Sequence, residues 1–324
     1  MVQYVNLKSN EKIVAVMDPP RLIVFSTPLI ATWVLDETHR ILFDAGDGCA
    51  ALLEGKIHKI NYIALTHAHR DHIAGLPQTL NLRAGTAWNT GAPLQIFHPE
   101  GSGSLMALGR FLSQFDHMTS GHALWHPLSP DDPRDVGDNR FIRAFATSHI
   151  PDSSAQNDGM PRSLGYHIGR RVDRLKSELR DQPQAEIDRL RAESGRDAII
   201  ERQEEILFSV SGDTRPLSPE TFAGTRFLLH ECTFLDTDEV SQAEACERGH
   251  AHSCLGEVLD VAQAADVQHL ALYHISKRYT DEEIIRAVRA ACARRDLKAK
   301  VSVALPGRVH FDLFSQTIWP LRKE

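Results

Sequence analysis

Residues 61 to 77 read NYIALTHAHRDHIAGLP, an apolar run that ends in a cluster of polar side chains. The run NYIALT (61–66) is typical of a buried β-strand. The positions directly after it hold four side chains that can ligate a metal ion: His67, His69, Asp71 and His72. The alternative is a chance cluster of surface histidines, in a chain that has 17 of them. His-x-His-x-Asp-His directly after an apolar strand favours the metal site.

The spacing of these four residues suits two ions. In an extended chain, side chains two residues apart point the same way, so His67 and His69 can bind one ion from the same side. A helix that begins near His72 would turn Asp71 and His72 toward a second ion. Imidazole and carboxylate ligands suit zinc, and by the same reasoning manganese or iron.

Two ions that each keep an open position need about seven or eight protein ligands, and the motif supplies four. Three more candidates follow apolar strands further along: His149, Asp213 and His274. Such positions lie at the carboxyl edge of a sheet, where open α/β folds gather their sites. Each has an ordinary alternative, since a histidine at a strand end is usually a satisfied polar residue and Asp213 could cap a helix.

The rest of the chain alternates between strand-like and helix-like patterns. The 324 residues suffice for two domains of about 150 residues, or for one large α/β unit, which we favour. Helical patterning covers 104–115, 252–265 and 280–294. Strand-like runs occur within 21–48 and at 61–66, 94–97, 140–147, 205–211, 226–230, 269–274, 301–305 and 309–314. Strands that come first in runs and then alternate with helices predict a layered α/β protein.

Composition excludes several classes of protein. With 42% hydrophobic and 24% charged residues the chain is a globular protein, not a disordered or coiled-coil one. A formal charge of -7 excludes a general basic field, so a polyanion must be bound locally. No apolar run is long enough for a membrane helix or a signal peptide. Five cysteines without a CxxC pair argue against a disulfide framework, and we expect a cytoplasmic protein.

Residues 173–205 are unusually charged, with seven basic and ten acidic side chains. Two apolar pairs at helical spacing, Leu175/Leu179 and Ile187/Leu190, predict an exposed helical hairpin that turns near residues 182–183. A solvated surface insertion is the interpretation we favour. The alternative is an arm that touches a partner subunit or a substrate, because those four side chains need something to cover them.

Taken together, the motifs resemble the metallo-β-lactamase superfamily and, within it, the ribonuclease Z branch. The matching stretches run through nearly the whole chain: FDAGDG (43–48), THAHRDHIAGLP (66–77), TSHIPDSS (147–154), SLGYHI (163–168), SGDTRP (211–216), LLHECTF (228–234), AHSC (251–254) and YHISKRY (273–279). The resemblance implies a four-layer αβ/βα sandwich with a dinuclear zinc site and a homodimer. It assigns one zinc to His67, His69 and His149, a second to Asp71, His72 and His274, and a bridging position to Asp213.

The resemblance also implies a mechanism of phosphodiester hydrolysis. Two divalent ions about 3.5 to 4 Å apart neutralise the phosphate and generate a bridging hydroxide near pH 7. Asp71 would orient that nucleophile or take its proton. Glu231 would hold His252, which would assist the departing 3′ oxygen as a general acid, although His252 could also merely begin a helix. Asp44 would hold the metal-binding loop in place without binding a metal ion itself.

Two further residues, Ser276 and Arg278, follow His274 and could contact the substrate phosphate, Arg278 in a bidentate manner. The alternative is a solvated turn.

The charged segment is where the chain departs from the family, whose arm carries Gly-Pro and basic residues that grip tRNA. In this chain the segment has one proline, one glycine and more acidic than basic residues. A segment with a net negative charge gains little binding free energy from contact with the phosphates of tRNA. We therefore favour a phosphodiesterase for which precursor tRNA is one possible substrate. The alternatives are a hydrolase of another ester, such as a cyclic nucleotide, a sulfate ester or a lactone, and a silent binding protein, which the complete ligand set disfavours.

Overall fold

The computed structural model describes residues 18–90, 92–116, 119–150, 159–236, 238 and 252–320. Within this part of the chain two mixed β-sheets pack face to face, of seven and eight strands. The first sheet has the order β14-β1-β2-β3-β4-β5-β6 and the second β15-β13-β12-β11-β10-β9-β8-β7. Parallel β3, β4, β5 and β6 form one half of the first sheet, and parallel β10, β11, β12 and β13 lie at the centre of the second.

The strands of the first sheet are β1 (Leu22–Thr27), β2 (Ala31–Asp36), β3 (Ile41–Phe43), β4 (Tyr62–Ala64), β5 (Leu94–Pro99), β6 (Ala123–Leu128) and β14 (Val309–Phe311). Those of the second are β7 (Pro133–Asp135), β8 (Arg140–Ala146), β9 (Leu164–Leu175), β10 (Ile200–Val210), β11 (Phe227–Glu231), β12 (His269–Tyr273), β13 (Lys300–Val303) and β15 (Thr317–Trp319).

The α-helices of the described residues are α1 (Cys49–Leu53), α2 (Arg70–Ile73), α3 (Leu76–Thr90), α4 (Gly103–Phe115), α5 (Gln184–Ser194), α7 (Leu255–Ala264) and α8 (Asp281–Arg294). Short 3-10 turns are η1 (Glu54–Lys59), η2 (Ser177–Leu179), η3 (Arg196–Ala198), η4 (Pro219–Phe222) and η5 (Leu313–Ser315). No helix in the described ranges combines the length and the apolar character that a bilayer crossing needs.

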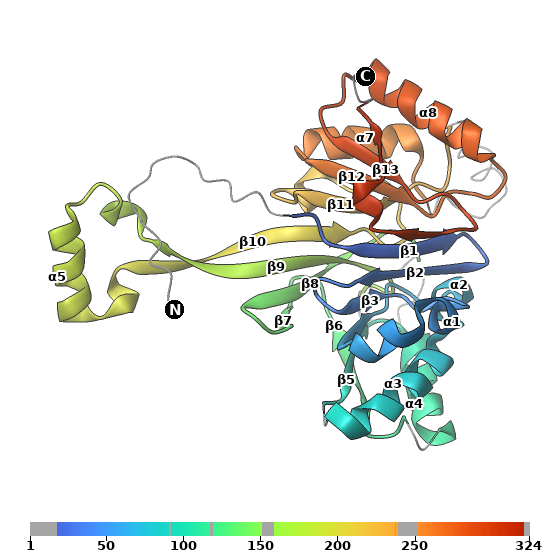
Figure 1. Cartoon of the computed structure of the whole chain (residues 1–324), viewed down its shortest axis with the longest axis horizontal. Helices are drawn as coiled ribbons and strands as arrows, with labels where there is room; N and C mark the ends of the chain where they lie inside the picture. Colours follow the sequence, from blue (N-terminus) through green and yellow to red (C-terminus); the bar gives the residue numbers. More distant parts are fainter. Residues whose placement is uncertain are drawn as a thin grey trace.

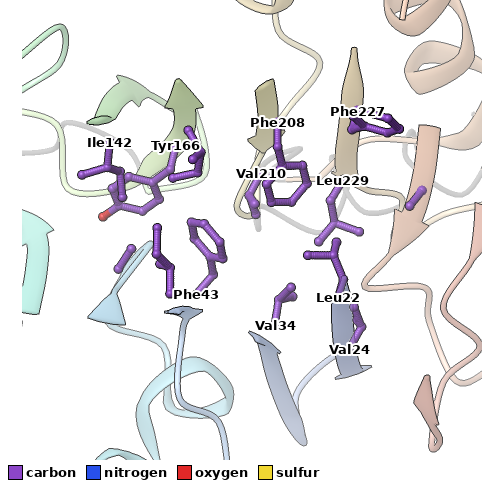
Figure 2. Packing of buried hydrophobic residues seen from close by; sticks show 14 of the residues in the cluster. Leu22, Val24, Val34, Phe43, Ile142, Tyr166, Phe208, Val210, Phe227 and Leu229 are labelled. Carbon is purple, nitrogen blue, oxygen red and sulfur yellow. The ribbon is translucent and has the colours of Figure 1, made fainter. Parts of the chain in front are cut away.

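Three apolar clusters hold the layers together. The central one lies between the sheets, where Val34 and Phe43 of the first sheet face Tyr166 and Phe208 of the second (Figure 2). A second cluster joins the outer face of the first sheet to α1, α3 and α4, and a third joins the outer face of the second sheet to α7 and α8. The order helix, sheet, sheet, helix is the predicted four-layer αβ/βα sandwich, which is confirmed (Figure 1).

Local sequence explains where the predicted helices begin. Thr280 caps α8, because its hydroxyl accepts from the Glu283 N–H while the Glu283 carboxylate accepts from the Thr280 N–H. Ser102 caps α4 in the same way by accepting from Leu105 N–H. The helices predicted at 104–115, 252–265 and 280–294 therefore appear as α4, α7 and α8, with no end shifted by more than three residues.

The helical hairpin predicted for residues 173–205 is wrong. Strands β9 and β10 continue into this segment as a two-stranded antiparallel ribbon, paired from Tyr166↔Val210 to Leu175↔Ile200, and only α5 and short 3-10 turns lie at its tip. Figure 1 shows the ribbon projecting from the body with α5 at its far end. The charges pair across the strands: Arg170 Nε donates to Glu205 at 2.9 Å, and Arg171 Nε donates to Glu204 at 3.2 Å.

The tip of the ribbon has its own small apolar core. Leu179, Ile187 and Ile199 are buried there, with Leu175, Leu190 and Ile200 packed against them. The apolar side chains that seemed to need a partner therefore cover one another, which removes that argument for an arm that contacts a second molecule.

Candidate metal centre

The candidate ligands lie at the carboxyl ends of strands in both sheets. In the first sheet, β3 leads to Asp44 and β4 leads to His67. In the second, β8, β10 and β12 run the same way and lead to His149, Asp213 and His274. Strands that run in the same direction end at one edge, so His67 and His274, which are 207 positions apart in the chain, meet there.

Hydrogen bonds between the sheets fix this edge. Tyr166 of β9 donates from its hydroxyl to the Leu65 carbonyl at 2.6 Å, and Leu164 N–H donates to the Thr66 carbonyl at 2.9 Å. His274 N–H donates to Ser26 Oγ at 3.1 Å. Asp44 and His274 have φ of 56° and 59°, left-handed conformations that a non-glycine residue adopts at some cost and that are common at functional sites.

The seven predicted metal ligands converge. Among the described residues, ligand atoms within 4.8 Å of one another form five sets, and three of these consist of the predicted ligands alone: His67, His69 and His149; His67, His72 and Asp213; and Asp71, His72 and His274. Asp213 lies at the centre, with its Oδ2 at 3.3 Å from Nε2 of both His72 and His274. The same oxygen is 3.8 Å from His149 Nε2 and 3.9 Å from His67 Nε2.

The donor atoms fit metal ions. Within the described part of the chain, four buried polar atoms of this cluster have no hydrogen-bond partner: Nε2 of His67, His72 and His274, and Oδ1 of Asp213. A buried polar atom without a hydrogen-bond partner lowers the stability of the fold by about 1 to 3 kcal/mol. Metal ions bound between these four atoms would satisfy them and so explain why they lie together. Neutral imidazole nitrogens and a carboxylate are the ligands that zinc prefers.

The pKa shifts of Asp213 and His67 agree with this fit, whereas Asp213 and Asp44 outweigh the effect of burial and raise the pKa of His72 well above its usual value. Burial by itself would raise the pKa of the Asp213 carboxyl, but the imidazoles of His274 and His72 outweigh it and hold that pKa well below its usual range. Burial, together with the neighbouring His72, lowers the pKa of His67 well below its usual value. Asp213 is therefore an anion and His67 is neutral, the protonation states in which both bind metals.

Asp44 and Asp71 accept hydrogen bonds from different donors. Asp44 Oδ2 accepts from Nδ1 of His72 at 2.7 Å, which leaves Nε2 of His72 to face Asp213. Asp71 Oδ2 accepts from the Leu29 N–H at 2.9 Å, a contact that the sequence did not suggest. Both carboxylates thus lie at the cluster, Asp71 beside the ligand atoms and Asp44 behind them.

Glu231 and His252 form a pair beside the cluster. Glu231 Oε1 accepts from Nδ1 of His252 at 3.1 Å. Burial alone would lower the pKa of His252, but the buried Glu231 carboxylate outweighs it and raises that pKa to about 9. The His252 side chain is 23% exposed and its ring centroid lies 4.8 Å from that of His149, so it stands at the mouth of the centre.

Ser276 and Arg278 lie on the turn after β12. Arg278 Nε donates to Ser276 Oγ at 3.1 Å, and its guanidinium lies 5.6 Å from the centre of the Phe234 ring. Their contact with a substrate phosphate stays a prediction.

Two threonines at the centre were not singled out from the sequence. Thr66 Oγ1 lies 2.9 Å from His67 Nδ1, and Thr233 Oγ1 lies 3.0 Å from His274 Nδ1. Thr66 stands within the histidine motif and Thr233 within LLHECTF. The sequence carries no pattern that marks either hydroxyl, since the partner of Thr233 is 41 residues away.

Comparison with known proteins places the chain in a family. Residues 39–175 match the family model described as beta-lactamase superfamily domain. The chain is 30% identical to ribonuclease Z of Haloferax volcanii over 264 residues, which is 74% of this chain and 76% of that one. It is 28% identical to ribonuclease Z of Thermococcus kodakarensis over 307 residues, 87% of this chain and 88% of that one.

Solved structures show the same fold. The metallo-beta-lactamase fold protein YhfI from Bacillus subtilis superposes with a TM-score of 0.59 at 16% identity and covers 91% of this chain and 100% of its own. The short form of human tRNase Z superposes with a TM-score of 0.54 at 19% identity, over 89% of this chain and 98% of its own. With the sequence relatives, this shows that the chain belongs to the ribonuclease Z family of the metallo-β-lactamase superfamily and is a metal-dependent hydrolase of the endoribonuclease type.

Proposed function

We propose that this protein cleaves phosphodiester bonds in RNA with two divalent metal ions, zinc being the ions that best suit its ligands. His67, His69 and His149 would hold one ion, Asp71, His72 and His274 the other, and Asp213 would lie between them. The observation that carries the proposal is the convergence of four buried, unsatisfied ligand atoms beside the Glu231–His252 pair. Manganese or iron could occupy the same nitrogen and oxygen ligands.

When bound, divalent ions neutralise phosphate charge and make a water molecule a stronger nucleophile at neutral pH. The side chains of this chain do the rest. Asp71, steadied by the Leu29 N–H, orients the attacking water and accepts its proton. As water attacks phosphorus, the bond from phosphorus to the 3′ oxygen breaks, and His252 donates a proton to that oxygen. Glu231 holds Nδ1 of His252, so its Nε2 is the donating atom.

Precursor tRNA is the substrate we propose first, because the family relatives are ribonucleases Z and one solved structure of the same fold is a tRNase Z. The charges of the ribbon formed by β9 and β10 are a reason to test a second class of substrate. Its arginines are engaged in ion pairs with acidic neighbours, Arg170 with Glu205, Arg171 with Glu204, and both Arg196 and Arg202 with Asp173. Arginines neutralised in this way release few counterions on meeting RNA. A smaller phosphodiester or another ester is therefore the alternative.

The experiment compares two substrates with zinc-loaded protein, a precursor tRNA with a 3′ trailer and bis(p-nitrophenyl) phosphate. Cleavage of both, each abolished in Asp71→Ala, supports a tRNA 3′ endonuclease. Cleavage of the small substrate alone supports the alternative. Asp197→Ala, which removes an exposed carboxylate of the ribbon tip, is the matched control for the small substrate. Turnover of both substrates by Asp71→Ala at the wild-type rate would contradict the mechanism.

The remaining expectations concern organisation. We propose a single domain, since the central apolar cluster takes side chains from both sheets. We also propose a homodimer, from the resemblance to the family, and a cytoplasmic location, for which Cys49, Cys232, Cys254 and Cys292 offer support as buried free thiols. Sedimentation of the purified chain tests the dimer.

A further inference from the structure

Two buried carboxylates organise the metal centre in the same way, one from each sheet. Asp44 follows β3 of the first sheet, and Glu231 ends β11 of the second. Each carboxylate binds one histidine directly, His72 for Asp44 and His252 for Glu231. Each also reaches a second histidine through a threonine hydroxyl.

The first relay joins Asp44, Thr66 and His67. Thr66 Oγ1 donates to Asp44 Oδ2 at 2.8 Å and lies 2.9 Å from Nδ1 of His67. The Thr66 N–H donates to the other oxygen of the same carboxylate at 2.7 Å. All three residues are buried, so water does not compete for these bonds.

The second relay joins Glu231, Thr233 and His274. Thr233 Oγ1 donates to Glu231 Oε2 at 3.0 Å and lies 3.0 Å from Nδ1 of His274. The Thr233 N–H donates to the same oxygen at 3.0 Å, which repeats the pattern of Thr66 with small changes.

The direction of each relay follows from the number of protons available. A carboxylate only accepts, so the single hydroxyl proton of each threonine goes to the carboxylate. The hydroxyl oxygen then has only lone pairs to offer the histidine, so Nδ1 of that histidine carries the proton and donates it. A neutral imidazole protonated on Nδ1 keeps a free lone pair on Nε2, and Nε2 of His67 and His274 are among the buried atoms without a partner.

Glu231 is bound more extensively than a partner of His252 alone requires. Its Oε1 accepts from the Thr214 N–H and the Ser253 N–H, each at 3.1 Å, as well as from His252. Thr214 follows the ligand Asp213 and Ser253 follows His252. One buried carboxylate therefore fixes the Asp213 loop, the His252 loop and, through Thr233, the ligand His274.

We propose that Thr66 and Thr233 are positioning residues that fix the metal-binding tautomers of His67 and His274, and that Glu231 serves the metal centre through Thr233 as well as His252. This inference rests on the proposed metal site. It assigns to Thr233 no contact with substrate, only control of one ligand. The loss of either hydroxyl leaves Nδ1 of its histidine without an acceptor and allows the tautomer that turns a proton toward the metal.

The test compares pairs of variants at each threonine. Thr233→Val and Thr66→Val keep the shape and remove the hydroxyl, whereas Thr233→Ser and Thr66→Ser keep it. Thr225→Val is the matched control, because Thr225 is also buried and bonds Ser209 Oγ at 2.8 Å in a separate hydrogen-bond chain that continues to His167 Nδ1, which belongs to none of the ligand sets. Zinc affinity is measured by competition with a chromophoric chelator, without any substrate, and circular dichroism reports folding.

We expect the valine variants to bind zinc about 10- to 100-fold more weakly, and the serine variants and Thr225→Val to stay within about threefold of the wild type. Thr233→Val should chiefly weaken the binding of one of the two zinc ions, the ion that His274 would hold. Wild-type affinity in both valine variants, or an equal loss in Thr225→Val, would overturn the inference. Failure of the wild type itself to bind zinc would instead overturn the proposed function. If a valine variant does not fold, alanine at the same position replaces it, since alanine removes the hydroxyl without added bulk.

Discussion

Oδ2 of Asp213 and Nε2 of His274 lie 3.3 Å apart at the edge of the second sheet, although β11 separates the strands that carry them. Asp213 follows β10 and His274 follows β12, and both are nearly inaccessible to solvent. A carboxylate so placed can bind two cations at once and keep them together.

Asp213→Asn keeps the shape of the side chain and removes its charge. We expect zinc stoichiometry to fall below two per chain and phosphodiester turnover to fall at least about 100-fold, because outer ligands cannot replace a central anion. Metal analysis after equilibrium dialysis, with Asp197→Asn as the control, checks this. Two tightly bound zinc ions in Asp213→Asn would argue against the bridging position.

His252→Gln should separate substrates by their leaving groups. A general acid contributes about 100- to 10,000-fold when the departing oxygen needs a proton, and much less when it leaves readily. We expect RNA cleavage to fall by about 100-fold or more and hydrolysis of bis(p-nitrophenyl) phosphate by less than about fivefold, with unchanged metal content. Equal losses on the two substrates would remove His252 from the role of general acid.

Gly46→Ala should displace α2, the short helix that carries Asp71. A Cβ at Gly46 would lie 2.3 Å from the Asp71 carbonyl oxygen and 2.5 Å from the Thr32 nitrogen, so backbone must move. We expect lower thermal stability and weaker zinc binding. Gly85→Ala in α3 is the control: its Cβ would meet nothing within 4 Å, and alanine favours a helix by about 1 kcal/mol. If both variants behave alike, the close packing at Gly46 is unimportant.

Two buried histidines that belong to none of the ligand sets, His167 and His269, should make stability depend on pH. Burial, with Arg143 for His167 and Lys300 for His269, lowers the pKa of each from 6.5 to about 4. The unfolded chain takes up these protons first as pH falls below about 6.5, so the folded state loses stability from there down to about pH 4.

The expected loss between pH 7.5 and 5 is about 2 kcal/mol for each histidine. Denaturant unfolding at both pH values measures it, and His269→Gln should show a loss smaller by about that amount. A difference between the two pH values that is the same in His269→Gln and the wild type would contradict the depressed pKa of His269.

The tip of the ribbon should unfold separately from the metal centre. Ile187→Ala removes a buried side chain from the small core of Leu179, Ile187 and Ile199 and should cost about 2 to 5 kcal/mol locally. We expect faster proteolysis within residues 175–200 and unchanged hydrolysis of bis(p-nitrophenyl) phosphate. Loss of that hydrolysis would show that the ribbon supports the site.

The sequence predicted the layers and brought the ligand candidates to one edge because both follow from short-range patterns. The polar residues His67, His69, Asp71 and His72 show where the apolar strand before them ends. The later candidates His149, Asp213 and His274 likewise follow directly on apolar strands. The metal roles of these residues stay predictions, but the geometry required of them is present.

The ribbon was predicted wrongly because charge patterns are ambiguous. Acidic and basic residues at 173–205 suit helical spacing, and they suit cross-strand pairs such as Asp173 with Arg202 equally well. Which pairing forms depends on strands β9 and β10, which both extend beyond the segment. Thr66 and Thr233 escaped notice for a related reason, since the role of a hydroxyl depends on partners that only the fold brings near.

The most direct test of the account is a titration of metal-free protein with zinc while hydrolysis of bis(p-nitrophenyl) phosphate is recorded. We predict no turnover without metal and a rate that rises to a plateau at two equivalents per chain. Turnover that persists in the presence of a strong chelator, or a plateau reached at one equivalent, would contradict a catalytic centre of two metal ions.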